Sequence, residues 1–509
     1  MSGTAGATEA AVEPIDLATL SLDSFNGRPV AVLGLARSGL ALCRFLADHG
    51  AIVTGYDARS SDELSAGLAR LEGRPVRLLL GPDVDPTAAL AGQALICTSP
   101  SVSSRYPTTE PRLRSALGEV EAAGGVPVVS EVDLFLRLCP AKTIGVTGTK
   151  GKTTTASLTA AVLEAGSAPV VLGGNIGIPL VEQLPELTAR HRVVLELSEL
   201  QLPTLSRGTD VALYTHVSSD HLDRHGTLAA YRAVKRRLAE LTPADGRLVL
   251  NGEDPVSAEF ATATRAATVF YRRSEPLPGG VGVRDGWIVA QRFATLPEVG
   301  GTTVALGPGG RVMPLDEVQL PGAHNVSNVL AAVAAGLLFG LAPDAIRRAV
   351  AAFSGVEHRL EPVASFEGVT FVNDSQGTQP DAVIAALHSF APPIVLIAGG
   401  RGKNLDMTEL AAEVGRRAAA VLLIGEAAAE FETLFGAAGA RRLERAASLE
   451  AAVERGHEIA RELGGGTVLL SPAATSFDMF VDYAARGAAF KTAVRDLAAR
   501  RAGLKDTQG

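Results

Sequence analysis

Residues 143–166 read TIGVTGTKGKTTTASLTAAVLEAG, and this stretch decides the fold. A short β-branched run leads into a glycine-bearing turn, and an alanine-rich segment follows and ends at Gly166. The pattern predicts a strand, a loop and a helix N-terminus, where free backbone N–H groups and the helix dipole favour an anion. Lys152 adds a positive charge, and Thr153 or Thr154 offers a hydroxyl to Mg²⁺. The stretch therefore predicts a phosphate-binding loop for ATP.

The loop departs in one place from the usual G-x-x-x-x-G-K-[ST] pattern. Val146 stands where the first glycine belongs, and the nearest upstream glycine is Gly145. Because G-K-T alone is common in loops, the strand before it and the helix after it carry the prediction.

Composition excludes several classes of protein. The chain has 509 residues, 47% hydrophobic and 20% charged, which is typical of a globular enzyme of two to four domains. A net charge of −8 argues against a protein that coats nucleic acid. Three cysteines without a C-x-x-C pair (Cys43, Cys97 and Cys139) exclude a disulfide scaffold and indicate a reducing compartment.

No targeting or membrane segment is expected. The first twenty residues lack a basic start and an apolar core, so they do not resemble a signal peptide. The longest apolar run, residues 329–342, is too short for a bilayer and predicts a buried helix. We therefore expect a cytoplasmic protein without a membrane span and without a nucleic-acid partner.

Strands and helices alternate along the chain, which predicts an α/β fold with mostly parallel sheets. We expect a loose extension over residues 1–25 and three Rossmann-like domains. These cover residues 26–140, residues 141–355 with the phosphate loop, and residues 356–509.

The first domain opens with PVAVLGLARSG at residues 29–39, a strand entering a glycine turn, and a second strand ends at Asp57. Such a turn can hold a phosphate, and the acidic residue can bind a ribose hydroxyl. Ala36 replaces a glycine of the dinucleotide fingerprint, so a purely structural strand-to-helix turn is an equal alternative.

The central domain carries polar residues in apolar surroundings. Glu196 lies in the strand pattern VVLELSELQ, where it is either a Mg²⁺ ligand beside the phosphates or a salt-bridged core residue. His221 and His225 are four residues apart, but a zinc site is disfavoured because no H-E-x-x-H pattern or third soft ligand accompanies them. Asn325 and Asn328 could bind a base or cap the helix that follows.

In the last domain three predicted strands each end in a polar or glycine loop. The ends of parallel strands share one edge of a doubly wound sheet, where ligands bind. This places together Asp374, Thr378, Lys403 and Ser476.

The motifs TGTKGKTTT, GNIG, ELSELQL, SSDHLDRH, YRAVK, GAHNVSN, EHR, NDSQGT, GGRGK and SPAATSFD occur in the order and spacing of the Mur ligases. The chain resembles that family from about residue 26 onwards. The loops NDSQGT and SPAATSFD are most similar to members that add glutamate to UDP-N-acetylmuramoyl-L-alanine. The resemblance implies that ATP phosphorylates the substrate carboxylate, and that the amine of glutamate, D rather than L, displaces the phosphate.

The resemblance also implies roles for individual residues. Lys152, Glu196, His221 and Lys235 are expected to be catalytic, with Thr153, Glu196, His221 and a CO₂-derived carbamate on Lys235 as ligands of two Mg²⁺ ions. By residue type alone, Lys235 beside Arg236 would belong to a solvated basic face. The ATP site is expected to comprise Gly148, Thr149, Lys150, Gly151, Lys152, Thr153, Thr154, Asn325, Asn328, Arg359 and Asp374.

Two further substrate sites follow from the same resemblance. The UDP-linked substrate is expected to contact Arg37, Ser38, Asp57, Arg59, Asn175, Ser198 and Gln201. Glutamate is expected to contact Thr378, Lys403, Ser476, Phe477 and Tyr483. Domain closure must bring these sites together, and the protein is expected to be a monomer.

The chain departs from the family pattern at three positions. Gln376 stands where a lysine commonly pairs with glutamate, Tyr483 where phenylalanine is usual, and Lys150 where asparagine is common. The alternatives are a related ligase with another amino acid, for example L-glutamate, a non-catalytic ATP-binding scaffold, and an NAD-type oxidoreductase. A folate-extending relative would lack the first domain.

Overall fold

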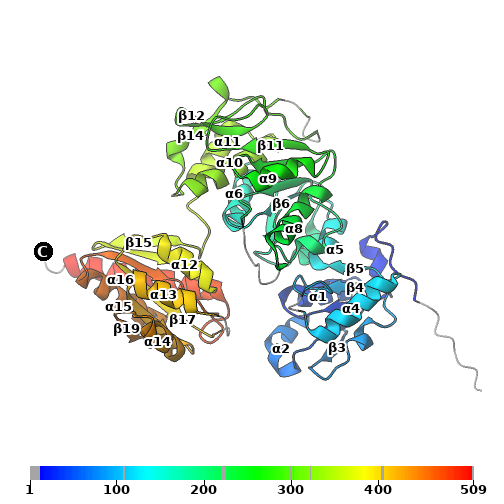
Figure 1. The fold of residues 1–509 in the computed structure, drawn as a ribbon, viewed down its shortest axis with the longest axis horizontal. Helices are drawn as coiled ribbons and strands as arrows, with labels where there is room; N and C mark the ends of the chain where they lie inside the picture. The colour runs from blue at the N-terminus through cyan, green and yellow to red at the C-terminus, as the bar shows by residue number, and fades with distance from the viewer. Residues whose placement is uncertain are drawn as a thin grey trace, which may run out of the picture. The chain divides into compact units, whose positions relative to one another are not determined.

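A computed structural model describes residues 12–106, 109–218, 225–297, 301, 303–320, 322–402 and 406–506. For residues 66, 381 and 504–506 it describes the backbone alone. The chain divides into two compact units, Met1–Phe353 and Ser354–Gly509. Figure 1 follows the elements of each unit along the chain.

The first sheet has five parallel strands in the order β3-β2-β1-β4-β5. The strands are β1 (Pro29–Leu33), β2 (Ile52–Asp57), β3 (Val76–Leu80), β4 (Leu95–Thr98) and β5 (Val128–Ser130). The helices are α1 (Arg37–Asp48), α2 (Ser61–Leu68), α3 (Thr87–Leu90), α4 (Pro111–Ala123) and α5 (Glu131–Leu138). Alternate residues of β1 enter different cores, because successive side chains of a strand point to opposite faces.

The second sheet has nine strands in the order β14-β13-β12-β11-β10-β9-β6-β8-β7. Its parallel strands include β6 (Lys142–Thr147), β7 (Val170–Gly174), β8 (Arg192–Glu196), β9 (Val211–Tyr214), β10 (Arg247–Asn251), β11 (Ala267–Tyr271) and β12 (Val281–Arg284). The antiparallel strands β13 (Trp287–Ala290) and β14 (Arg311–Pro314) form one edge.

Helices cover both faces of the second sheet. They include α6 (Lys152–Glu164), α8 (Leu228–Leu241), α9 (Pro255–Glu259), α10 (Ala323–Leu338) and α11 (Pro343–Ala352), with the short 3-10 segments η3 (Leu180–Glu186) and η4 (Leu202–Thr204). Helix α10 is buried along most of its length and packs on α6, as the apolar run predicts. One hydrophobic core continues from Phe25 and Phe135 to Leu195 and Tyr214, so the first two sheets share buried side chains.

The second unit holds a six-stranded sheet in the order β15-β16-β20-β17-β18-β19. Its strands are β15 (Glu361–Phe366), β16 (Val369–Asn373), β17 (Ile394–Gly399), β18 (Ala418–Ile424), β19 (Leu443–Arg445) and β20 (Gly466–Leu470), and all but β15 pair in parallel. The helices are α12 (Pro380–His388), α13 (Thr408–Arg417), α14 (Ala428–Ala437), α15 (Leu449–Glu462) and α16 (Tyr483–Asp506). Separate apolar clusters fill the two faces of this sheet.

These observations confirm the predicted α/β class with three mostly parallel sheets. The domain bounds at residues 140 and 355 stay predictions. Within the residues that the structure describes, none of the helices has the length and apolarity needed to cross a membrane.

Candidate active site

The turn between β6 and α6 has the backbone of an anion-binding loop. Gly148 has φ 147° and Gly151 has φ 85°, both in the region that favours glycine. A Cβ at Gly148 would overlap Thr215 Oγ1, and one at Gly151 would lie 2.7 Å from Asn328 Oδ1. Helix α6 begins at Lys152, so its free N–H groups face this turn.

Val146 is compatible with this turn because it lies in the strand before it. It is fully buried in β6 and pairs in register with Glu196 of β8. The tight backbone approach falls at Gly148, and the position of Val146 needs only an apolar strand residue.

Side-chain and backbone contacts join the loop to helix α8 and to the segment that follows β9. Lys152 Nζ donates to Thr149 O at 2.9 Å, and Thr149 Oγ1 lies 2.9 Å from Tyr231 Oη. The backbone of Lys150 forms an antiparallel bridge with His216, while its side chain is exposed. The departure from asparagine at residue 150 therefore leaves the loop backbone intact.

Glu196 ends β8 beside the phosphate loop, with 2% of its surface exposed. Its Oε1 accepts a hydrogen bond from Asn175 Nδ2 at 2.9 Å. Among the described residues, Oε2 has no hydrogen-bond partner and no basic side chain pairs with the carboxylate. The salt-bridged alternative therefore has no support there, and a carboxylate oxygen left over in this way fits Mg²⁺, which binds carboxylate, water and phosphate oxygens.

Lys235 is buried, which corrects the expectation from residue type alone. Its exposed fraction is 0%, whereas Arg236 of the same helix is exposed. Its Nζ lies 3.5 Å from Thr147 Oγ1 and 5.4 Å from the centre of the Tyr231 ring. Helix α8 thus directs this lysine at the end of β6 and not into solvent.

Asn325 and Asn328 lie inside the first two turns of α10, so they do not cap it; Gly322 occupies the cap position. Asn328 Nδ2 donates to Asn325 Oδ1 at 3.0 Å. Asn328 is 6% exposed and adjoins Gly151, so this amide pair lies against the phosphate loop.

In the first domain, Asp57 fastens the glycine turn. Its Oδ2 accepts from Leu35 N at 2.7 Å, and Arg59 donates to both carboxylate oxygens at 2.9 and 2.7 Å. Burial alone would raise the pKa of Asp57, but the hydrogen bonds from Arg59 and Leu35 outweigh it and lower the pKa. Arg37 and Ser38 open α1 directly after this turn, and Arg37 is exposed.

Ser198 and Gln201 form a compact polar pair after β8. The Ser198 backbone N–H and hydroxyl donate to Gln201 Oε1 at 2.9 and 3.0 Å. Asn175 follows β7, and its backbone N–H donates to Glu196 O at 2.9 Å. Asn175, predicted to contact the UDP-linked substrate, is thus a direct neighbour of the predicted metal ligand Glu196.

The second unit gathers its predicted residues at the ends of β16 and β20. Ser471 Oγ donates to Asp374 Oδ2 at 2.6 Å, and Leu360 N donates to Oδ1 at 3.2 Å. Burial raises the pKa of Asp374 to about 6, although the bond from Ser471 opposes this shift. Thr378 is half-buried in the loop after Asp374.

The remaining glutamate candidates differ in exposure. Ser476 is buried, whereas Phe477 is 62% exposed and Tyr483 is 38% exposed. Ser375 Oγ donates to Tyr483 O at 2.7 Å, which joins the start of α16 to the loop after β16.

Comparison with known proteins decides the family. Residues 146–336 match the Mur ligase middle domain, and residues 358–474 match the Mur ligase glutamate ligase domain. A protein of Symbiobacterium thermophilum named UDP-N-acetylmuramoylalanine–D-glutamate ligase is 39% identical over 92% of this chain and 98% of its own length. Proteins with the same name from Desulfitobacterium hafniense and Pelotomaculum thermopropionicum are 38% and 37% identical over 93% and 94% of this chain, and 98% and 99% of theirs. The chain belongs to the Mur ligase family.

Solved structures agree with this Mur ligase in fold. UDP-N-acetylmuramate-alanine ligase MurC from Thermotoga maritima matches with a TM-score of 0.51 at 16% identity, covering 92% of this chain and 99% of that one. MurF from Acinetobacter baumannii matches with a TM-score of 0.50 at 17% identity, over 88% and 91% of the two chains.

Two predicted site residues of the Mur ligase, His221 and Lys403, lie outside the described residues. His225 is described, and its ring lies 5.5 Å from the Tyr231 ring in an edge-on arrangement. The described part of the chain holds no cluster of three His, Cys, Asp or Glu residues that could bind a metal. The described residues that fit Mg²⁺ are Glu196 and the buried Thr153, which suits an ion held largely by phosphate and water.

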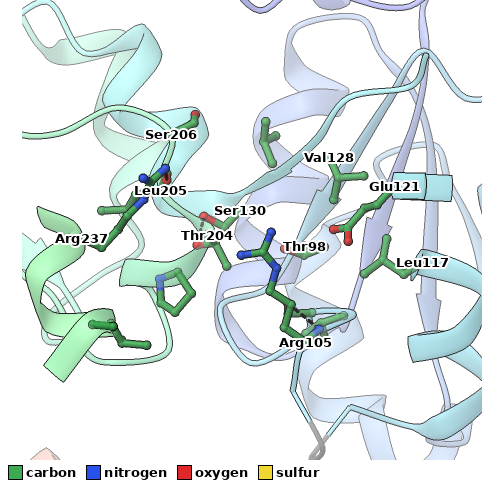
Figure 2. A pocket seen from close by; sticks show the side chains of 16 residues that line it. Thr98, Arg105, Leu117, Glu121, Val128, Ser130, Thr204, Leu205, Ser206 and Arg237 are labelled. Carbon is green, nitrogen blue, oxygen red and sulfur yellow. Dashed lines mark hydrogen bonds between the residues drawn. The ribbon is translucent and has the colours of Figure 1, made fainter. Parts of the chain in front are cut away.

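A cavity of about 620 Å³ lies between the first two sheets of the Mur ligase (Figure 2). Its walls come from the end of β4 and the loop after it, β5, helix α4, η4 with the segment after it, and helix α8. The lining includes Thr98, Arg105, Glu121, Ser130, Thr204 and Arg237. None of the residues predicted to bind ATP, UDP or glutamate lines it. The predicted site residues therefore lie outside this cavity.

One buried residue next to the predicted glutamate site, Arg486, was not predicted from the sequence. It is 1% exposed and bonds to the loops after β16 and β20. The sequence did indicate that Arg486 is buried. It lies at helical spacing from Phe490, Val494 and Leu497, which form the core-facing side of α16.

Proposed function

We propose that this Mur ligase joins D-glutamate to UDP-N-acetylmuramoyl-L-alanine and converts ATP to ADP and phosphate. The observation that carries the proposal is the match to relatives of this name over 92% of the chain and 98% of the relative's length. The phosphate loop, Glu196 and the buried Lys235 support it, because a non-catalytic scaffold would have no need to keep charged groups buried at one strand edge.

The reaction overcomes the poor electrophilicity of a carboxylate. The terminal carboxylate oxygen of the UDP-linked substrate attacks the γ-phosphorus of ATP, the bond to the β-phosphate oxygen breaks, and ADP leaves. The glutamate amine then attacks the acyl phosphate and loses a proton. Collapse of the tetrahedral oxyanion breaks the carbon–oxygen bond to phosphate and leaves an amide. Such transfer depends on positioning and on neutralising charge.

The residues of the first unit have matching tasks. The turn at Gly148 and Gly151 with the N-terminus of α6 cradles the β- and γ-phosphates, and Lys152 offsets their charge. Glu196, Thr153 and His221 would hold Mg²⁺, which would supply positive charge to offset the charge that develops on the phosphates. A carbamate on Lys235 would turn the buried cation into an anion that supports a second Mg²⁺. Asn325 and Asn328 contact the nucleotide.

The other substrates bind at the remaining strand ends. Arg37, Ser38, Asp57 and Arg59 hold the uridine diphosphate, while Asn175, Ser198 and Gln201 hold the muramoyl peptide. Arg359 and Asp374 complete the ATP site from the second unit. Glutamate is bound by the loops that carry Thr378, Lys403, Ser476, Phe477 and Tyr483.

We place the reaction in the cytoplasm and assign it to a monomer. Cys43, Cys97 and Cys139 are all unpaired, which suits a reducing compartment. Size-exclusion chromatography with light scattering checks the monomer, and a dimer mass would contradict it.

The direct test is a phosphate-release assay with purified enzyme, ATP, Mg²⁺ and UDP-N-acetylmuramoyl-L-alanine, in which the amino acid is varied. We expect release with D-glutamate, and little with L-glutamate, alanine or lysine. Release that requires L-glutamate would establish the related-ligase alternative. ATP binding without release under any of these conditions would establish a non-catalytic scaffold.

A further inference from the structure

Arg486 lies in the first turn of α16 and is the largest of the fully buried side chains in the described chain. Its Nε donates to Ser375 Oγ at 3.0 Å, and its Nη2 donates to Ser375 O at 2.9 Å. Both Nη1 and Nη2 donate to Ala474 O at 3.3 Å. One guanidinium thus fastens the loop after β16 to the loop after β20.

The same guanidinium also lies under a third loop. A Cβ at Gly400, after β17, would lie 3.2 Å from Arg486 Nη1 and would overlap Thr475 O. Strands β16, β20 and β17 are adjacent and parallel, so their ends form one edge. Arg486 therefore lies beneath the edge at which a doubly wound sheet binds its ligand.

The charge of Arg486 has no carboxylate partner among the described residues. Its four hydrogen bonds go to three neutral oxygen atoms. Burial lowers the pKa of Arg486 to about 10, and the charge of Asp478 opposes this shift, so the group stays charged at neutral pH. An unpaired buried cation is costly to keep. An anion bound at the edge above it would offset that cost.

The loop above Arg486 carries no positive charge at the position where the family commonly has lysine. Gln376 is neutral, and its Nε2 donates to Glu357 O at 3.2 Å. Thr378 and Ser476, two of the proposed glutamate contacts, belong to the two loops that Arg486 joins. The positive charge of the Arg486 guanidinium therefore lies close to both loops.

We infer that Arg486 is a positioning and specificity-determining residue for the amino-acid substrate. It holds the loops after β16 and β20 in place, and its unpaired charge favours a substrate whose side chain is anionic. This inference rests on the proposed function, since it concerns the site to which glutamate is assigned.

The test compares Arg486→Met and Arg486→Lys with the wild type as full-length enzymes. In Arg486→Met we expect the KM for glutamate to rise on the order of tenfold or more, with a smaller change in kcat. The KM for the UDP-linked substrate stays within about twofold, because its proposed contacts all belong to the other compact unit. Arg486→Lys keeps the charge but loses the planar set of guanidinium donors. Its KM for glutamate is therefore expected to lie between those of the wild type and Arg486→Met.

Arg442→Met is the matched control. Arg442 belongs to the same unit but pairs at the surface with Glu444 and Glu462, both at 2.8 Å. We expect its KM for glutamate to stay within about twofold of wild type, since exposed ion pairs contribute little. A rescue arm adds methylguanidinium to Arg486→Ala, where it lowers the KM for glutamate, and to Arg442→Ala, where it does not.

A folded Arg486→Met enzyme with the wild-type KM for glutamate overturns the inference, whatever happens to its melting temperature. Where Arg486→Met does not fold, Ser375→Ala and Arg486→Lys decide, and unchanged KM values in both also overturn it. A wild type that releases no phosphate with any form of glutamate refutes the proposed function instead. The series is then repeated with the amino acid that the enzyme uses, and a neutral or cationic one overturns the role of Arg486.

Discussion

At the scale of single residues, the site is built from ionisable groups withdrawn from water. Glu196 is 2% exposed and Lys235 is 0% exposed, and both lie next to the end of β6. A charge withdrawn from water is costly unless a ligand or a partner offsets the loss of hydration. In the proposed reaction, phosphate and Mg²⁺ would supply that compensation.

We predict that Lys235→Ala lowers the rate of phosphate release by about 100-fold or more, because it removes a group that supports charge in the transition state. Short-chain carboxylates such as acetate should restore part of the rate, since they can fill the cavity and stand in for a carbamate. The rescue is measured as kcat against acetate concentration. Unaltered activity in Lys235→Ala would remove this residue from the mechanism.

At the scale of elements, helix α5 joins the first sheet to the second through two acidic residues in its first turn. Ser130 caps it, and its side chain accepts from Asp133 N. Asp133 accepts from Ser206 N at 2.6 Å and pairs with Arg137 at 3.0 Å. Glu131 accepts from Val181 N at 3.2 Å but has no such pair among the described residues, and burial raises its pKa to about 7.

We predict that Glu131→Gln stabilises the protein at pH 8. The folded-state pKa lies above the ordinary value of 4.5, so ionising Glu131 costs more in the folded protein than in the unfolded chain. Its contribution to stability is therefore greatest below pH 4.5 and is lost as the pH rises toward 7. The gain from glutamine is of order 3 kcal/mol at pH 8.

Denaturant unfolding at pH 8 and at the lowest pH that keeps the protein folded measures this difference. The stability gain should shrink as the pH falls toward 4.5. Asp133→Asn in the same turn is the contrasting variant, and it should destabilise the protein because it weakens the pair with Arg137. A gain that is equal at all pH values would contradict the assigned cause.

At the scale of the whole molecule, the proposed reaction needs groups from both compact units. Lys152 and Asn328 belong to Met1–Phe353, while Arg359 and Asp374 belong to Ser354–Gly509. Each unit has hydrophobic cores of its own. Binding of the substrates is what must bring the two sets of residues together.

We predict that a non-hydrolysable ATP analogue together with UDP-N-acetylmuramoyl-L-alanine lowers the radius of gyration in small-angle scattering. The reason is that the proposed contacts of ATP lie on both units and can be made at the same time only when the units approach. The UDP-linked substrate alone is the control and should change the radius less. An identical radius with and without both ligands would contradict closure.

Local patterns predicted the backbone of the site well. The β-branched run, the glycines and the alanine-rich segment around residues 143–166 predicted β6, its turn and α6, because strand, turn and helix preferences act within a few residues. The apolar run after Asn328 likewise predicted the buried α10. The family resemblance predicted a catalytic role for Lys235, whereas the residue types around it predicted a solvated face.

Contacts between distant residues were beyond such patterns. The burial of Lys235 depends on Thr147, which is 88 residues away, and that of Arg486 depends on Ser375, which is 111 residues away. The carboxylate of Asp57 accepts hydrogen bonds from Leu35 and Arg59. Its role in holding the turn could therefore be recognised only in the folded chain.

The α/β class, the strand, turn and helix of residues 143–166 and the family could all be predicted from the sequence, because they rest on short-range preferences and on motif order. The tertiary structure decided which charges are buried and what each one contacts. Burial and electrostatic cost depend on every neighbour in space, so no local stretch of the chain could determine them.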